Sequence, residues 1–296
     1  MKLTDRQPKI IVVGSCSLDL ILDVNRIPEA NDTVIATKFE TFFGGKGANQ
    51  AVGVARLGAS SYLISCVGMD PSGQQIMRNL VEEEVNIGFV FEDEMEPTGR
   101  AYVASELGKN SIIVVPSANY CLDVSKVSSA EKYFQTCDMV LLQLEITMDV
   151  VEYTVKLAKN NGKKVGIYAA PAFYLKPEIL DKLDFIIAKK SELKTIFGEQ
   201  FQDEIIKKYP NKLFVRDDDN STTYYNGSEM CYQSFNQNEL MFKMGMGDAF
   251  TSGFSIALCH ENTIEDCVRF GNKVSLKVAQ QRGAQKGLPY LDDVVG

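Results

Sequence analysis

The chain has 296 residues, a length that fits one large domain or a large domain with a small appendage. Its net charge of −8, with 39 Asp and Glu against 31 Lys and Arg, argues against non-specific binding to nucleic acid. A hydrophobic content of 45% allows a sizeable core, and the apolar runs are too short to suggest a span through a membrane.

Strand-like and helix-like segments alternate along most of the chain. The predicted elements in chain order are a strand at 9–13, a helix at 47–57, a strand at 61–67, a helix at 74–84, a strand at 139–144, a helix at 150–160, strands at 164–168, 185–188 and 213–216, and helices at 248–258 and 263–280. This alternation predicts an α/β fold with a mainly parallel sheet that is covered on both faces.

Two segments interrupt the alternation. Residues 32–41 and 101–115 are β-rich stretches with no helix beside them, and Gly108-Lys109-Asn110 marks a turn within the second. They predict a small antiparallel sheet that projects from the main domain as a lid. Because no repeat or low-complexity linker is present, we expect residues 1–296 to form a single domain, with lid strands within about 20–43 and 97–116.

Seven cysteines are scattered along the chain without a CxxC pair, and His260 is the single histidine. We expect buried, reduced thiols in a cytoplasmic protein, rather than disulfides. One histidine argues against a zinc site or a Ser-His-Asp triad. The polar start of the chain, Met1 to Lys9, predicts no signal peptide.

A glycine-rich segment, Gly44-Gly45-Lys46-Gly47-Ala48-Asn49-Gln50, directly precedes a helical pattern. Glycines there let the backbone approach a ligand closely, and the N–H groups at a helix start favour polar or anionic groups. The Asn49 amide both donates and accepts hydrogen bonds, which suits sugar hydroxyls. A plain tight turn that caps a helix would explain the glycines equally well, and the P-loop pattern is absent.

A second glycine-rich segment, Gly245-Met246-Gly247-Asp248-Ala249-Phe250, opens another predicted helix. Its backbone N–H groups could form an anion hole for phosphoryl oxygens. Asp248 could accept a proton from a hydroxyl, as general bases do in phosphoryl transfer. Taken alone, Asp248 is better explained as a residue that favours the start of a helix than as a base.

Two further acids follow predicted strands. Asp19 comes shortly after the strand at 9–13, and Glu145 ends the apolar strand at 139–144. Ligands of open parallel sheets sit at the carboxyl ends of the strands, so both acids could meet a polyol. Each could also be an ordinary solvated acid.

Together these segments resemble the ribokinase/PfkB carbohydrate kinase family, nearly from end to end. The segments that carry the resemblance, in family order, are GGKGANQAVGVARLG (44–58), VGMDPSG (67–73), PTGRAYV (97–103), GKNSIIVVPSAN (108–119), LLQLE (141–145), GMGDAFTSGF (245–254) and RGAQKGLP (282–289). Two signatures at the right separation, with the intermediate motifs in order, form a specific combination.

The resemblance implies a ribokinase-like, doubly wound α/β domain whose β lid pairs with a second subunit in a homodimer. It implies an ATP- and Mg²⁺-dependent kinase for a small sugar, D-ribose or a related pentose. The residues that stand at the family's site positions fall into five groups: sugar-binding Ser17 (an asparagine in most ribokinases), Asp19, Gly45, Lys46, Asn49 and Glu145; the base Asp248; the anion hole Gly245, Met246 and Gly247; nucleotide-binding Lys189 and Asn272; and Glu192 for the metal.

The departures from the family pattern cluster at the nucleotide and cation sites. The family often uses an activating monovalent cation, but Phe242 replaces an aspartate that binds it, which argues against such activation here. Lys189 replaces an asparagine, and residues 216–221 (RDDDNS) replace the TLGxxG loop. Three consecutive carboxylates near ATP phosphates would repel them. These changes leave open a catalytically impaired sugar-binding relative with a regulatory role, and the fold also admits a nucleoside substrate.

Overall fold

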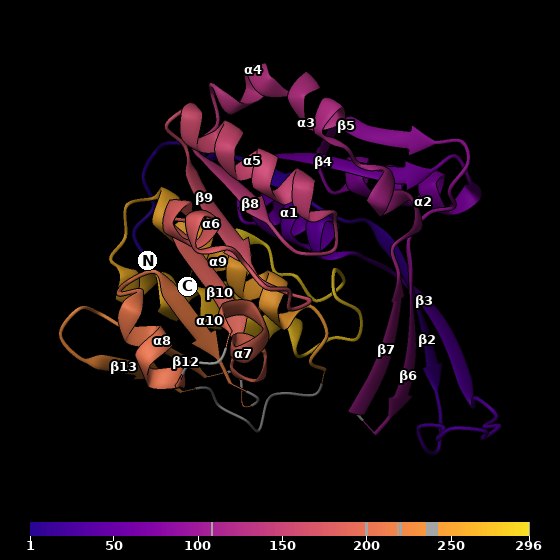
Figure 1. Cartoon of the computed structure of the whole chain (residues 1–296). Helices are drawn as coiled ribbons and strands as arrows, with labels where there is room; N and C mark the ends of the chain where they lie inside the picture. The colour runs from indigo at the N-terminus through magenta and orange to yellow at the C-terminus, as the bar shows by residue number, and fades with distance from the viewer. Residues whose placement is uncertain (108, 199–200, 218, 220, 235–241, 296) are drawn as a thin grey trace.

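The computed structural model describes residues 1–296 apart from 108, 199–200, 218, 220, 235–241 and 296. Within these residues, one large sheet has the strand order β13-β12-β11-β10-β9-β8-β1-β4-β5 (Figure 1). Its strands are β1 (Lys9–Val13), β4 (Ser60–Gly68), β5 (Asn86–Asp93), β8 (Met139–Leu142), β9 (Lys164–Tyr168), β10 (Phe185–Lys189), β11 (Leu213–Arg216), β12 (Thr222–Tyr225) and β13 (Met230–Gln233). The strands from β11 to β5 run parallel, and β12 and β13 are antiparallel additions at one edge.

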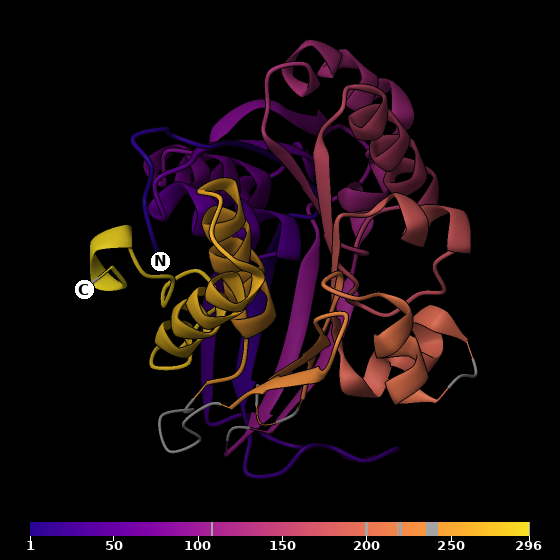
Figure 2. The same ribbon diagram turned by 90° about the vertical axis from the view of Figure 1, so that its left-hand side faces the viewer.

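Helices cover both faces of this sheet (Figures 1 and 2). One face packs against α1 (Lys46–Arg56), α2 (Pro71–Glu82), α9 (Met246–Cys259) and α10 (Ile264–Val278). The other face packs against α3 (Val124–Ser129), α4 (Glu131–Phe134), α5 (Met148–Asn160), α6 (Pro177–Lys182), α7 (Leu193–Phe197) and α8 (Gln202–Lys208). The central strands are buried on both sides, which explains their continuous apolar runs. The predicted doubly wound α/β fold is confirmed.

The strand order reverses at β1, and this reversal places the site. From β1 the chain winds outward through β4 and β5 on one side and through β8, β9, β10 and β11 on the other. At the carboxyl ends of β1 and β8 the following loops therefore run to opposite sides and leave a crevice between the two halves of the sheet. Ser15 and Glu145 follow β1 and β8 and lie at this crevice.

A second sheet, with the order β3-β2-β6-β7, extends away from the main domain (Figure 1). Its strands are β2 (Ser17–Asp23), β3 (Lys38–Gly44), β6 (Arg100–Glu106) and β7 (Lys109–Val115). β2 pairs antiparallel with β3 and parallel with β6, and β6 pairs antiparallel with β7. β6 and β7 thus form the predicted antiparallel strands of a lid within the second β-rich stretch, whereas only the end of the predicted stretch 32–41 is a strand.

The strands β5, β12 and β13 were not predicted from the sequence. β5 is half-buried at one edge, with Asn86, Glu92 and Asp93 among its residues, so its apolar pattern is weak. β12 and β13 form the opposite edge and are rich in threonine and tyrosine. Among the described residues, no helix is both long and apolar enough to traverse a bilayer.

Candidate active site

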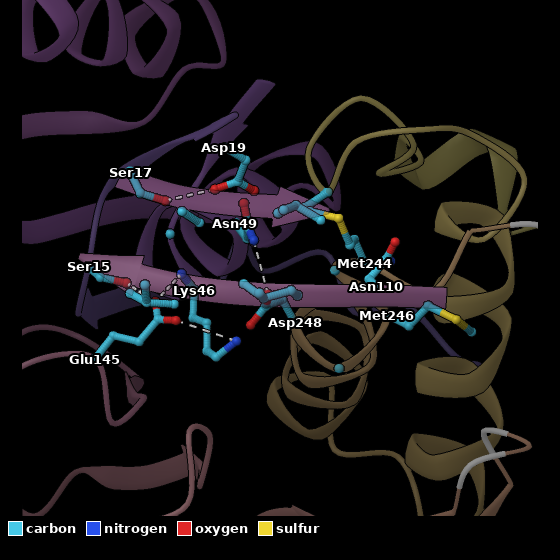
Figure 3. Close-up of a pocket in the computed structure, with 18 of the residues that line it drawn as sticks. Ser15, Ser17, Asp19, Lys46, Asn49, Asn110, Glu145, Met244, Met246 and Asp248 are labelled. Atoms are coloured by element: carbon cyan, nitrogen blue, oxygen red, sulfur yellow. Dashed lines mark hydrogen bonds and ion pairs between the residues drawn. The ribbon is translucent and has the colours of Figure 1, made fainter. Parts of the chain in front are cut away.

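A cavity of about 680 Å³ lies at the crevice, between the carboxyl ends of the parallel strands and the inner face of the lid. Strand β7 of the lid adds Asn110, Ile112 and Val114 to the wall, a contribution that the sequence analysis did not assign to the site. Most predicted site residues meet here: Ser17, Asp19, Gly45, Lys46, Asn49, Glu145, Lys189, Gly245, Met246, Gly247 and Asp248. Figure 3 shows the core of this group.

Glu145 is held at the end of the crevice by the loop after β1 and the start of α1. The Ser15 hydroxyl donates to Glu145 Oε2 at 2.5 Å, and the backbone N–H of Lys46 donates to the same oxygen at 3.0 Å (Figure 3). Lys46 Nζ lies 3.5 Å from the other oxygen, Oε1. Burial alone would lower the pKa of Lys46, but the carboxylates of Glu145, Asp248 and Asp19 raise it, so the ammonium stays charged.

Asp19 points into the cavity from β2 of the lid. Its carboxylate accepts a hydrogen bond from the Ser17 hydroxyl at 3.0 Å (Figure 3), and the residue is 5% exposed. Burial, with a smaller contribution from the nearby Glu145 carboxylate, raises the pKa of Asp19 to about 7, against the opposing effects of the Ser17 hydrogen bond and of Lys46. A side chain at Gly44 would occupy the position of this carboxylate, which explains the glycine. Asp19 therefore holds a charge that gains by meeting hydrogen-bond donors from a ligand.

Asp248 lies in the first turn of α9, against the first turn of α1. Asn49 Nδ2 donates to one carboxylate oxygen at 3.0 Å (Figure 3). Gln50 Nε2 donates to the other oxygen at 3.1 Å. Asp248 is 3% exposed, and burial raises its pKa, while Lys46 and the two amides oppose that rise. The result is a buried carboxylate that faces the cavity with both oxygens oriented by neutral donors.

A second buried amide extends this arrangement. Gln143, the residue after β8, donates from Nε2 to Gln50 Oε1 at 2.7 Å, and both glutamines are fully buried. The order Gln143, Gln50, Asp248 forms a chain of hydrogen bonds that fixes the orientation of the Gln50 amide. The sequence analysis missed it, although one signal was present: Gln143 is a polar residue within the apolar run from 139 to 144.

Backbone geometry at the start of α9 brings its N–H groups to the cavity. Gly245 precedes the helix with φ of 78°, a left-handed conformation that favours glycine. A Cβ on Gly247 would lie 2.3 Å from the hydroxyl oxygen of Tyr168, so only glycine fits beside that ring. Tyr168 ends β9 and lines the cavity. The first N–H groups of a helix have no partner within the helix, so a helix start of this kind can bind an anion.

The acidic run after β11 does not face the cavity as a block. Asp217 forms an ion pair with Lys190 at 2.7 Å. Asp219 accepts hydrogen bonds from the Ser221 N–H at 2.8 Å and the Tyr232 hydroxyl at 3.3 Å, so it is turned toward β13. Asp218 lies outside the described residues. The repulsion that the sequence predicted is therefore reduced by an ion pair and by the orientation of Asp219.

Two predicted site residues stand behind the wall of the cavity. Asn272 on α10 is 5% exposed, and its Oδ1 accepts from Arg216 and from Thr222. Glu192, in the short helical turn after β10, is half-buried, and its Oε2 is buried without a hydrogen-bond partner among the described residues. Their assigned roles in binding the nucleotide and the metal remain predictions.

The fold and the cavity define a class of protein: a doubly wound α/β domain with a β lid over a cavity that combines a buried carboxylate with a glycine-flanked helix start. Comparison with known proteins makes the class more specific. The pattern of the pfkB family of carbohydrate kinases matches residues 7–291. The chain is 34% identical over 286 residues to a ribokinase of Bacillus subtilis, which covers 96% of this chain and 97% of the relative.

Solved structures of ribokinases have the same fold as this chain. A ribokinase of Arabidopsis thaliana, determined with ribose and ATP, has a TM-score of 0.84 at 26% identity and covers 98% of each chain. A ribokinase of Thermotoga maritima has a TM-score of 0.85 at 27% identity and covers 97% of this chain and 98% of its own. The chain belongs to the pfkB family of ATP-dependent carbohydrate kinases. The alternative of a catalytically impaired relative finds no support in these similarities.

The burial of Asp19 yields a prediction that does not depend on function. Its folded pKa is raised above the unfolded value, so the ionised carboxylate opposes folding above about pH 7, and this penalty disappears below the unfolded pKa near 3.8. Asp19→Asn should therefore raise the thermal midpoint of the ligand-free protein at pH 8, by the equivalent of a few kcal/mol, and leave it nearly unchanged at pH 3.8.

The measurement is thermal unfolding of both proteins between pH 4 and pH 8. Exposed Asp5 provides the matched control, since Asp5→Asn should change the midpoint little at any pH. A variant no more stable than the parent at pH 8 would contradict the burial cost that we assign to Asp19.

Proposed function

We propose that the protein transfers the γ-phosphoryl group of ATP to a hydroxyl of a small sugar, D-ribose or a related pentose. The observation that carries the proposal is the position of Asp248: a buried carboxylate at the anion-binding start of α9, in one cavity with Asp19, Asn49 and Glu145. The relatives named ribokinase and the neighbour determined with ribose and ATP support this choice of substrates.

On this proposal each residue acts through the chemistry of its side chain. Asp19, Asn49 and Glu145 bind sugar hydroxyls, since carboxylate and amide oxygens accept hydrogen bonds from a polyol. Asp248 accepts the proton of the attacking hydroxyl as its oxygen bonds to phosphorus. The N–H groups of Gly245, Met246 and Gly247 stabilise the charge on the transferring phosphoryl group. The inner face of the lid covers the cavity and excludes water.

The residues present fit magnesium but not a monovalent cation. The buried Oε2 of Glu192, which has no hydrogen-bond partner among the described residues, is available to hold Mg²⁺ directly or through water. When bound, the ion neutralises charge on the nucleotide phosphates. At the position of the cation ligand the chain has Phe242, whose N–H donates to the Ala279 carbonyl at 2.9 Å, and an aromatic ring supplies no oxygen ligand.

If Asp248 is the base, its substitution should reduce turnover without reducing the affinity for the sugar. Asp248→Asn removes the proton acceptor but keeps the size of the side chain, so sugar phosphorylation should fall by about 100- to 10,000-fold. Calorimetry should show nearly unchanged affinity for the sugar. Asp5→Asn, at an exposed position, serves as the control and should keep full activity. Sustained turnover by Asp248→Asn would exclude Asp248 as the base.

The amide of Gln50 predicts a shift in the pH profile. Its hydrogen bond favours the ionised form of Asp248 and so lowers the pKa of that carboxyl. Gln50→Leu should raise this pKa, and because the base must be ionised, the acidic limb of the kcat profile should move to higher pH. Gln74→Leu, at an exposed position of α2, should leave the profile unchanged. An unshifted acidic limb in Gln50→Leu would show that this amide does not stabilise the charge.

We also propose that the lid sheet pairs with a second copy of the chain and that the protein works in the cytoplasm. Register places Phe39, Tyr102 and Ile113 on the face of the lid opposite the cavity, and their exposed fractions are 59%, 39% and 67%. An apolar face beside the exposed edge strand β7 favours association. The seven cysteines are free thiols, as a reducing compartment would keep them.

Dimerisation predicts that a charge on the outer face separates the subunits. Ile113→Asp should reduce the mass in light scattering from that of a dimer to that of a monomer at micromolar concentration, because it buries a carboxylate in an apolar contact. Met95→Asp, at an 88% exposed position outside the lid, should leave the mass unchanged. A parent protein that is already monomeric would contradict the proposal.

A further inference from the structure

Arg216 is a buried cation in the wall of the cavity. It ends β11 and lines the cavity, yet it is only 3% exposed. Nη1 donates to Asn272 Oδ1 at 2.9 Å and to Thr222 Oγ1 at 3.2 Å, and Nη2 donates to Ser275 Oγ at 3.2 Å. All three acceptors are neutral. Among the described residues, no carboxylate forms an ion pair with this guanidinium.

An arginine in such surroundings keeps its charge at a cost. Burial lowers the pKa of Arg216 to about 10, with Tyr168 and Asp219 opposing the shift, so the side chain is still a cation at neutral pH. Buried charges in proteins are normally paired, because removal from water is unfavourable without a counter-charge. The N–H on Nε and the second N–H on Nη2 also donate to no described residue. An anionic ligand would satisfy both deficits.

The surroundings of Arg216 place this charge beside the anion-binding start of α9. Ser275, which accepts from Arg216, donates to the Met246 carbonyl at 2.9 Å. The guanidinium also lies over the ring of Phe250, 4.3 Å from its centroid, one turn further along α9. The arginine is thus fixed against the same helix whose first N–H groups face the cavity. Both features attract negative charge to one place.

The nearby acids do not supply the missing counter-charge. Asp217 is paired with Lys190, and Asp219 is bound to Ser221 and Tyr232. Lys189 and Lys243 line the same end of the cavity. Asp217 also lines this end but is paired with Lys190, so the charges of Lys189 and Arg216, which are neighbours in the register of β10 and β11, make it more positive than the rest of the cavity wall.

We propose that Arg216 is the fixed positive charge of the donor site and that the phosphate chain of the bound nucleotide is its counter-charge. The inference rests on the proposed function, since it concerns the nucleotide of that reaction. It identifies Arg216 as a residue that selects for the number of phosphates: affinity should rise with nucleotide charge, whereas binding of the uncharged nucleoside should not depend on it. Arginine suits this role because its planar fork can satisfy a phosphate while its other N–H groups stay bonded to the protein.

The test compares ADP with adenosine by calorimetry at saturating D-ribose. Arg216→Gln removes the charge and keeps some hydrogen-bonding capacity, so it should weaken ADP binding by about 10- to 100-fold. Adenosine binding should stay nearly unchanged. Arg216→Lys keeps the charge and should recover much of the ADP affinity. Arg78→Gln, at an exposed position of α2, is the matched control and should bind as the parent does.

The salt dependence of ADP binding, and the comparison of ADP with adenosine, distinguish a contact with phosphate from a purely structural role. Added salt should weaken ADP binding strongly in the parent and in Arg216→Lys, and less in Arg216→Gln, because salt screens the contact between charges. Equal losses for ADP and adenosine would show that Arg216 only supports the fold, and unchanged ADP affinity in an active Arg216→Gln enzyme would also overturn the inference. A parent protein that binds no nucleotide and phosphorylates no sugar would instead overturn the proposed function, and this inference with it.

Discussion

Two hydrogen bonds to the Asp248 carboxylate join distant parts of the chain at the floor of the cavity. Asn49 and Gln50 stand 199 and 198 positions before Asp248, and their amides connect the first turn of α1 with the first turn of α9. Each partner needs the other: without the carboxylate the buried amides lose an acceptor, and without the amides the buried carboxylate loses two hydrogen bonds. They therefore set the helix packing and bring the two glycine-rich turns to one place.

The central part of the fold could be predicted because its strands are buried on both faces. The bounds predicted for β1, β9 and β11 agree with the structure, since continuous apolar runs end sharply where a loop begins. The edge strands β5, β12 and β13 have one exposed side and mixed composition, so periodicity gave no clear signal there. For the lid, the stretch 32–41 has β-rich composition, yet only from Lys38 onward does it pair with β2.

The candidate site divides in the same way. Residues in local motifs, such as Asn49 and Asp248, could be assigned from the sequence because a short pattern carries them. Gln143, Tyr168 and Arg216 could not, because their significance comes from partners on other elements. Arg216 appeared in the sequence as the start of an altered loop, and only its contacts with α10 make it a buried cation. The sequence suggests that the carboxylates from Asp217 to Asp219 act together as one block of negative charge. In the structure Asp217 and Asp219 bond to different partners.

Charge is distributed unequally along the cavity, and this distribution bears on the departures from the family pattern. Asp19, Glu145 and Asp248, with the cation Lys46 among them, line the end proposed for the sugar, and Lys189, Arg216 and Lys243, with Asp217 paired to Lys190, line the end proposed for the nucleotide. A neutral polyol can bind among carboxylates through its hydroxyl donors, whereas a polyanion is repelled there and attracted to the other end.

Two departures increase that polarity. Lys189 replaces an asparagine and Arg216 replaces the threonine of TLGxxG, so each adds a positive charge where the phosphates would bind. The acid at position 217, which the same loop introduces, is paired with Lys190. Loss of a glycine-rich loop removes close backbone contacts with phosphate, and an added cation is a different physical solution to the same requirement, because it attracts the phosphates through charge. Substitutions that suggest an eroded site in the sequence are thus consistent, in three dimensions, with a donor site that binds by charge.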